Sequence, residues 1–391
     1  MSNKGRFVSS VVQGLAPSGI RKFFDLVMAM DDVISLGVGE PDFVTPWHIR
    51  EACFYSLERG YTMYTSNQGM LELREEIANY YDKWQGLKYN PVDDVLVTVG
   101  VSEAADLAMR AVLEPGDEVL IPEPSYVSYV PCTLMAAGVP VSLDTTAEYD
   151  FRLQPDELKK KITPKSKVLI LPYPNNPTGG VMNREDLAAL VDIIVENDLL
   201  VVSDEIYGEL TYDGNHVSIA TLPGMYERTI VLNGFSKAYA MTGWRIGYAC
   251  GDPEIIGAMN KIHQYTMLCA PIMGQMAALE ALRHGEPEMR RMVEDYDYRR
   301  RLILKGLNEI GLDCFEPKGA FYVFPSIAVT GMSSEEFSEK LLFEENVAVV
   351  PGNAFGSSGE GYIRCCYASS VDQIQNALER IERFVNKYRK V

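Results

Sequence analysis

The chain has 391 residues, of which 47% are hydrophobic and 23% charged, so it is long enough for two domains with ample cores. Its net charge of −18 opposes binding to nucleic acid or to an anionic membrane surface. No apolar run reaches the roughly 20 residues that span a bilayer, and the first residues lack a signal-peptide pattern, which predicts a cytoplasmic location.

Cysteines and histidines give no support for a metal mechanism. The seven cysteines form no CxxC pair and lie in apolar surroundings, so we expect reduced core residues. The four histidines show neither HExxH nor zinc-site spacing. The cysteines are Cys53, Cys132, Cys250, Cys269, Cys314, Cys365 and Cys366.

From about residue 94 to residue 251, short apolar runs alternate with helical patterns. Several runs are apolar at nearly every position, as strands buried on both faces are. The pattern predicts an α/β fold with a mostly parallel seven-stranded sheet sandwiched by helices. The predicted strands are 95–99, 118–122, 140–143, 168–171, 199–203, 229–232 and 246–249, with helices such as 103–113 and 184–196 between them.

Beyond residue 251 the pattern changes. A long helical stretch runs through 285 and over 286–307, followed by β-rich segments at 321–324, 348–351 and 362–367 and an amphipathic helix at 372–388. We therefore expect a large domain over 47–285, and a smaller α+β domain made of 1–46 and 286–391.

Polar side chains follow four of the predicted strands, at 100–102, 175–179, 204–207 and 236–237. In doubly wound sheets the ligand lies beyond these carboxyl ends. The first, a strand followed by Gly100 and a helix start, directs backbone N–H groups at an anion, although Ser102 also fits an ordinary helix cap. No GxGxxG is present, which disfavours a dinucleotide.

Three charged residues at or after these strand ends are Asp204, Lys237 and, eight residues beyond the lysine, Arg245. A buried carboxylate such as Asp204 requires a cationic partner, although the residue also fits a helix cap. Lys237 follows a mostly apolar run, and a partly desolvated lysine near other cations becomes a nucleophile, whereas most lysines are solvated. Arg245 fits either an anion clamp or a surface charge.

Together, NNPTGG, SDEIYGEL and NGFSKAYAMTGWRIGYACG resemble the signature blocks of the fold-type I, class I/II pyridoxal-phosphate-dependent aminotransferases. Further matching blocks, from LGVGEPDF to EGYIRCCYASS, extend the resemblance in order over nearly the whole chain. Within the family, the chain is most similar to the aspartate, aromatic and N-acetyl-diaminopimelate aminotransferase branch.

The resemblance implies pyridoxal 5′-phosphate as cofactor. Lys237 matches the lysine that bonds to the cofactor and then moves the proton between the substrate Cα and the cofactor. Asp204 matches the carboxylate that pairs with the pyridine nitrogen. Asn176 and Tyr207 match the residues that bond the ring oxygen, and Tyr126 matches the aromatic residue stacked on the ring.

The resemblance also implies a phosphate cup and a substrate clamp. The cup residues are Val101, Ser102, Ser236, Arg245 and Tyr64 of the partner subunit. The family often has a hydroxyl residue where this chain has Gly234, which predicts one hydrogen bond fewer in the cup. Arg364 matches the arginine that binds the α-carboxylate through two charge-assisted bonds, completed by Gly39 and Asn176.

The implied reaction is ping-pong transfer of an amino group from an L-amino acid to a 2-oxo acid such as 2-oxoglutarate. Because Tyr64 is shared between subunits, the implied working form is a homodimer. Alternatives are a carbon–sulfur β-lyase of the same fold, and a cofactor-sensing regulator, which carries an added basic DNA-binding region. The absent glycine fingerprint opposes a Rossmann dehydrogenase.

The sequence offers candidate residues for two kinds of substrate side chain. An aromatic side chain requires an apolar slot, for which the candidates are Tyr126, Phe321, Tyr322, Ile20 and Met267. A second carboxylate requires a cation, for which Arg21 is the candidate. Phe321 and Met267 fit core packing better than substrate binding. We expect aspartate/aromatic specificity.

Overall fold

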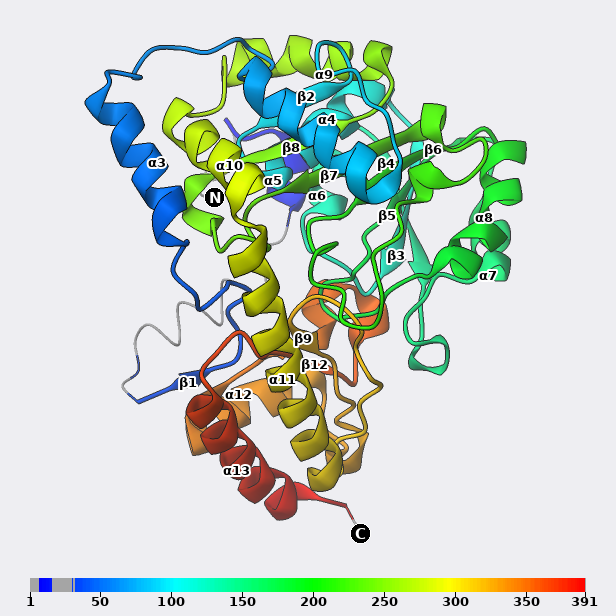
Figure 1. Ribbon diagram of the computed structural model, residues 1–391. Helices are drawn as coiled ribbons and strands as arrows, with labels where there is room; N and C mark the ends of the chain where they lie inside the picture. Colours follow the sequence, from blue (N-terminus) through cyan, green and yellow to red (C-terminus); the bar gives the residue numbers. More distant parts are fainter. Residues whose placement is uncertain (1–6, 16–29, 31, 391) are drawn as a thin grey trace.

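The computed structural model describes residues 7–15, 30 and 32–390. Ile20 and Arg21, predicted as substrate-side candidates, lie outside the described residues. Figure 1 shows an α/β part, the large region, above a smaller α+β part, the small region. Helix α11 (Glu286–Ile310) extends from the large region into the small region.

The large region is built on the predicted seven-stranded sheet, in the order β2-β8-β7-β6-β5-β3-β4. Strand β8 is antiparallel to its neighbours β2 and β7, and the remaining pairs are parallel, so the mostly parallel sheet is confirmed. Its strands are β2 (Val95–Thr98), β3 (Glu118–Glu123), β4 (Val139–Asp144), β5 (Ser166–Leu171), β6 (Leu200–Asp204), β7 (Thr229–Gly234) and β8 (Gly247–Cys250).

Both faces of this sheet are buried, which explains its almost continuous apolar runs. Along β3, Val119 and Ile121 pack into one core with residues of α5, whereas Leu120 packs into another with residues of α8. Alternation between two covered faces requires an apolar residue at each position. The core thereby fixes the strand ends, where the site lies.

Helices cover the sheet and build the small region (Figure 1). The predicted helix at 184–196 coincides with α8, which begins with a capping box between Asn183 and Asp186. The other described helices are α1 (Ser10–Gly14), α3 (Trp47–Glu58), α4 (Leu71–Gln85), α5 (Val101–Val112), α6 (Tyr129–Met135), α7 (Pro155–Lys161), α9 (Pro253–Thr266), α10 (Ile272–His284), α12 (Ser334–Glu345) and α13 (Val371–Tyr388).

The small region contains an antiparallel sheet in the order β11-β12-β9, formed by Val350–Pro351, Ile363–Cys366 and Tyr322–Val323. The predicted strand at 348–351 is not continuous. Strand β10 (Val347–Ala348) pairs instead with β1 (Ile34–Ser35), because the chain passes at Val349 from one sheet to the other. In β12, Arg364 pairs with Val350 and Cys365 with Val323. The domain boundaries stay a prediction.

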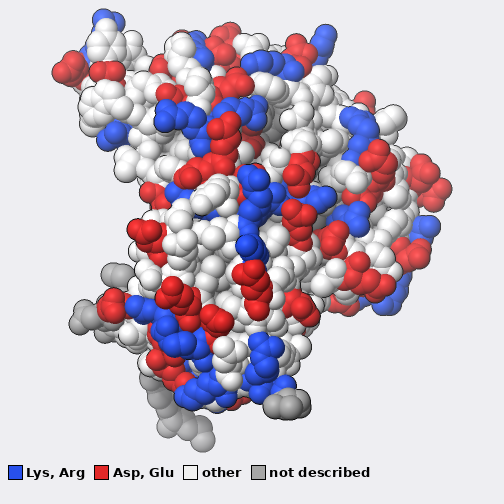
Figure 2. Space-filling model, turned by 60° about the horizontal axis from the view of Figure 1, so that its bottom comes forward, with Lys and Arg blue, Asp and Glu red and all other residues white. Residues whose placement is uncertain are grey.

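The surface carries charges of both signs, and the cysteines are free thiols. Figure 2 shows acidic and basic side chains interspersed over one face. Within the described ranges, no helix has the length and hydropathy of a membrane span. All seven cysteines are free, and five are buried as expected. The expectation of core burial is wrong for Cys269 and Cys314, which are partly exposed.

Candidate active site

A cavity of about 760 Å³ lies where the carboxyl ends of β5, β6 and β7 face the small region. Tyr64 does not line this cavity. It lies elsewhere on the large region and is 82% exposed. The other predicted site residues all line the cavity: Gly39, Val101, Ser102, Tyr126, Asn176, Asp204, Tyr207, Ser236, Lys237, Arg245 and Arg364. The structure therefore brings together segments that are far apart in sequence.

One end of the cavity is suited to an anion. Helix α5 begins at Val101, and its cap is Gly100 rather than Ser102, so the helix-cap alternative for Ser102 is wrong. Gly100 has φ of 78°, and a Cβ there would lie 2.5 Å from the Arg245 Nη2 atom. Glycine thus lets the guanidinium approach the helix N-terminus, where free N–H groups attract negative charge.

Gly234 is explained by close backbone packing. A Cβ at this position would lie 2.9 Å from the Cα atom of Gly247 and 3.0 Å from the Ile246 carbonyl oxygen. Strands β7 and β8 pair at this point, Gly234 opposite Gly247. A hydroxyl side chain would require these strands to separate, so its absence follows from the packing.

Asp204, the last residue of β6, is buried beneath the cavity. Its carboxylate accepts hydrogen bonds from the Tyr129 hydroxyl at 2.8 Å and from the Ile206 backbone N–H at 3.2 Å. The residues after it form a turn and no helix, so the helix-cap alternative is wrong here too. Burial raises the pKa of Asp204 to about 6, and the Tyr129 hydrogen bond opposes this rise.

Sequence reasoning missed Tyr129, because a tyrosine in an apolar helical pattern fits core packing. Its ring is buried among core residues at the start of α6, and only its hydroxyl has a polar role. The spacing from Tyr126 in PSYVSY was the available signal, and the two rings make an edge contact with centroids 5.7 Å apart. Ser128 and Thr242, which also line the cavity, were missed as well.

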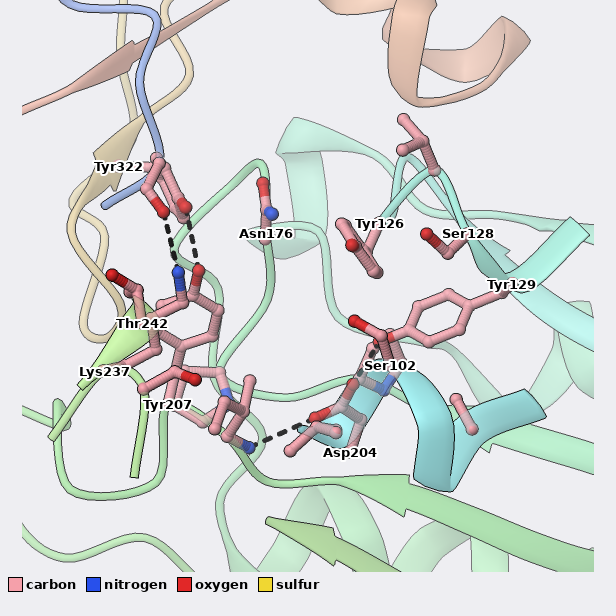
Figure 3. Close-up of a pocket in the computed structure, with 18 of the residues that line it drawn as sticks. Ser102, Tyr126, Ser128, Tyr129, Asn176, Asp204, Tyr207, Lys237, Thr242 and Tyr322 are labelled. Atoms are coloured by element: carbon pink, nitrogen blue, oxygen red, sulfur yellow. Dashed lines mark hydrogen bonds between the residues drawn. The ribbon is translucent and has the colours of Figure 1, made fainter. Parts of the chain in front are cut away.

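Lys237 lies opposite Asp204 in Figure 3 and points its ammonium toward the Gly39 carbonyl, 2.7 Å from Nζ. Burial lowers the pKa of Lys237 to about 8; Arg364 and Arg245 act in the same direction, whereas Cys366 and Glu40 oppose it. An amine with this pKa is neutral in about a tenth of molecules at pH 7, far more often than an ordinary lysine, and the neutral form is what a nucleophile or proton acceptor requires.

Arg364 is the buried cation of the opposite wall, with only 2% of the residue exposed. Its guanidinium donates to the Asn176 side-chain oxygen at 2.9 Å and to the Gly37 carbonyl at 2.6 Å. It also lies over the Tyr322 ring, 4.5 Å from the centroid. Within the described part of the chain, its buried Nε has no hydrogen-bond partner. The guanidinium is therefore held in place, and its Nε–H remains available to donate to a ligand.

Aromatic side chains form the remaining walls (Figure 3). The hydroxyls of Tyr207 and Tyr322 are 2.8 Å apart, and both rings are buried. Phe321 is fully buried behind them, in agreement with core packing. Core packing is wrong for Met267, whose residue is 47% exposed and lies outside the cavity.

These groups suit a flat ring that carries an anionic substituent. The ring's anion would face α5 and Arg245, a basic ring nitrogen would face Asp204, and Lys237 would lie near a reactive carbon. Arg364 remains for the carboxylate of a second molecule, because a buried guanidinium binds such a group through paired hydrogen bonds.

Comparisons with known proteins agree with this chemistry. Residues 31–381 match the family described as "Aminotransferase class I and II". The chain is 53% identical to the putative aminotransferase YugH of Bacillus subtilis, over 97% of this chain and 99% of that protein. It is 48% identical to an aspartate aminotransferase of Pyrococcus abyssi, over 95% and 96% of the two chains.

Solved structures also match over nearly the whole chain. The aromatic aminotransferase of Pyrococcus horikoshii has a TM-score of 0.90 and 46% identity, over 93% of this chain and 99% of that one. The aspartate aminotransferase of Thermus thermophilus with maleate has a TM-score of 0.92 and 39% identity, over 96% and 99%.

Proposed function

This chain belongs to the class I and II aminotransferases, which depend on pyridoxal phosphate, and from that premise we propose that it transfers amino groups of aspartate or aromatic L-amino acids to 2-oxoglutarate. The relatives named aspartate and aromatic-amino-acid aminotransferases support this substrate range. One observation carries the proposal: a lysine of lowered pKa, a buried carboxylate and a buried arginine with a free donor meet at one cavity. The β-lyase alternative is not favoured, because the relatives are aminotransferases.

On the cofactor side, the roles rest on charge and burial. When bound, pyridoxal phosphate supplies a ring that accepts the negative charge of the deprotonated substrate carbon. We assign to Asp204 the task of holding a proton on the ring nitrogen, and to Arg245 the neutralisation of the phosphate. The N–H groups of α5, with Ser102 and Ser236, would complete the anion site.

On the substrate side, Arg364 would bind the α-carboxylate, with Asn176 and Gly39 beside it. Lys237 would accept the proton that leaves the substrate Cα, because its pKa of about 8 suits proton transfer near neutral pH. Next to the substrate, Tyr126 would stack on the cofactor ring, and Tyr207 would donate a hydrogen bond to the oxygen of that ring. Together these residues would bind the substrate, orient it against the cofactor and move the proton.

We also propose a homodimer that shares its sites. Large apolar residues are exposed on and after α3 and at the end of α9, a pattern typical of a subunit interface: Trp47, Phe54, Tyr55, Met63, Tyr64 and Tyr265. Tyr64 lies outside the cavity of its own chain, as expected for a residue that serves the other subunit. A cytoplasmic location stays a prediction.

The test is the visible absorbance of the purified protein with a panel of amino acids. We expect a band from the lysine-bound cofactor that disappears with glutamate, aspartate or an aromatic amino acid and returns with 2-oxoglutarate. Lys237→Ala should bind the cofactor, but its absorbance should not change and return in this way. Its rate of amino transfer should fall at least about 10²–10⁴-fold.

Each other outcome contradicts a part of the proposal. Release of pyruvate and ammonia without a 2-oxo acid would indicate a lyase. A band that no amino acid alters would exclude the proposed substrates, and a protein that binds no cofactor would contradict the whole assignment.

A further inference from the structure

The segment 37–43 covers one side of the cavity with little backbone support. It lies between β1 and α3, outside any helix or strand. Among the described residues, no backbone–backbone hydrogen bond involves residues 37–45, whereas the flanking Leu36 and Pro46 both make them. Its position over the site therefore depends on side chains of other segments.

Two of these side chains are needed for the reaction itself. Arg364 donates to the Gly37 carbonyl, and Lys237 donates to the Gly39 carbonyl. In the proposed reaction both cations must also engage the substrate and the cofactor, so their bonds to the segment are exchanged or shared. A further anchor is required if the segment is to keep its place during turnover.

Arg299 of α11 is the charged anchor that the reaction does not use. Its residue is 7% exposed, and its Nη1 donates to the Asp42 carboxylate at 2.7 Å. Its Nη2 donates to Asp295, one turn earlier on the same helix, at 2.6 Å. The guanidinium also lies 5.1 Å from the centroid of the Phe43 ring. It thus holds the segment by two adjacent side chains.

Aromatic packing links this anchor to the cavity. Phe43 makes an edge contact with Tyr296 at 5.3 Å, and Tyr296 packs against Phe321 at 5.6 Å. Phe321 in turn contacts Tyr207 at 5.4 Å. A displacement of Phe43 would therefore reach the site wall through three packed rings.

We propose that Arg299 and Asp42 are positioning residues, which hold segment 37–43 so that Gly39 and Arg364 meet the substrate carboxylate. The inference rests on the proposed function, since it concerns the affinity for that substrate. Neither residue lines the cavity, so both act through the segment. The phosphate and ring-nitrogen contacts, made by α5, Arg245 and Asp204, are supported separately by the large sheet, so cofactor affinity should not respond.

The test compares two isosteric variants of the holoenzyme, Asp42→Asn and Asp295→Asn, which remove the two charges around the same guanidinium. Asp42→Asn should raise the KM for the amino acid and for the 2-oxo acid roughly tenfold, with kcat and cofactor affinity nearly unchanged. Asp295→Asn should leave KM near the wild-type value. Asp42→Glu, which keeps a carboxylate for Arg299, should recover most of the lost affinity.

The outcomes separate the two proposals. Equal KM values for Asp42→Asn and Asp295→Asn, or a matching loss of cofactor affinity in Asp42→Asn, would overturn the positioning role. A wild-type enzyme that transfers no amino group would overturn the proposed function instead, whatever the variants do.

Discussion

The two walls of the cavity are held in different ways. The wall proposed to bind the cofactor consists of strand ends and a helix start, where Asp204 ends β6 and Ser236 follows the adjacent β7 in a sheet buried on both faces. The wall proposed to bind the substrate consists of Arg364 and two segments that it joins through the Gly37 carbonyl and Asn176. Backbone ladders fix the first wall, whereas in the second wall side-chain hydrogen bonds of Arg364 join its strand to the other two segments.

This difference predicts separable effects of mutation. A change on the cofactor wall should alter cofactor affinity or electronics, and a change on the substrate wall should alter KM. Three variants test the separation.

On the substrate wall, the largest effect is expected for Arg364→Ala. Loss of this buried cation leaves the substrate carboxylate unpaired, which should lower kcat/KM roughly 10²–10³-fold. Steady-state kinetics with saturating cofactor measures the loss, and a cofactor titration gives the control. A similar fall in cofactor affinity would show that the two walls are not independent.

Asp204→Asn should change how the free energy of unfolding depends on pH. The pKa of Asp204 is raised from 3.8 to about 6 by burial, so its contribution to stability is fully present below about 3.8 and is lost as pH rises through about 6. The wild-type protein without cofactor should lose about 3 kcal/mol of unfolding free energy over this window. Asp204→Asn should lack that loss.

Urea unfolding of both proteins without cofactor, between pH 4 and pH 7, measures this difference. Parallel stability curves would contradict the raised pKa. The variant should be inactive at every pH, because an amide does not hold a proton on the ring nitrogen as a carboxylate does.

The smallest effect is expected for Tyr129→Phe. The lost hydroxyl removes one hydrogen bond to Asp204, worth about 1 kcal/mol, and raises the pKa of Asp204 further. We expect the rate to fall about tenfold at neutral pH, with the acid limb of the pH–rate profile shifted upward and the amino-acid KM unchanged. An unshifted profile would reduce Tyr129 to a packing role.

Much of the cofactor wall could be predicted from local sequence. Apolar runs marked the strands, and the polar residues at the end of each run marked the site, as Asp204 illustrates. Tyr129 could not be found this way, because its ring satisfies the apolar pattern and only its hydroxyl faces Asp204.

The substrate wall depended on the family resemblance. Arg364 lies in a short strand between Ile363 and Cys365, and no local pattern indicates that it faces a cavity. The break at Val349 and the Arg299–Asp42 pair also depend on contacts between distant segments, which periodicity does not report.

Strand β12 has only four residues, and its side chains alternate between two faces. Arg364 faces the cavity, and the adjacent Cys365 pairs with Val323 of β9. A slip of one position would exchange the guanidinium for a thiol. The turns before and after β12 should therefore tolerate no insertion or deletion of a single residue, because their length determines whether a cation reaches the substrate.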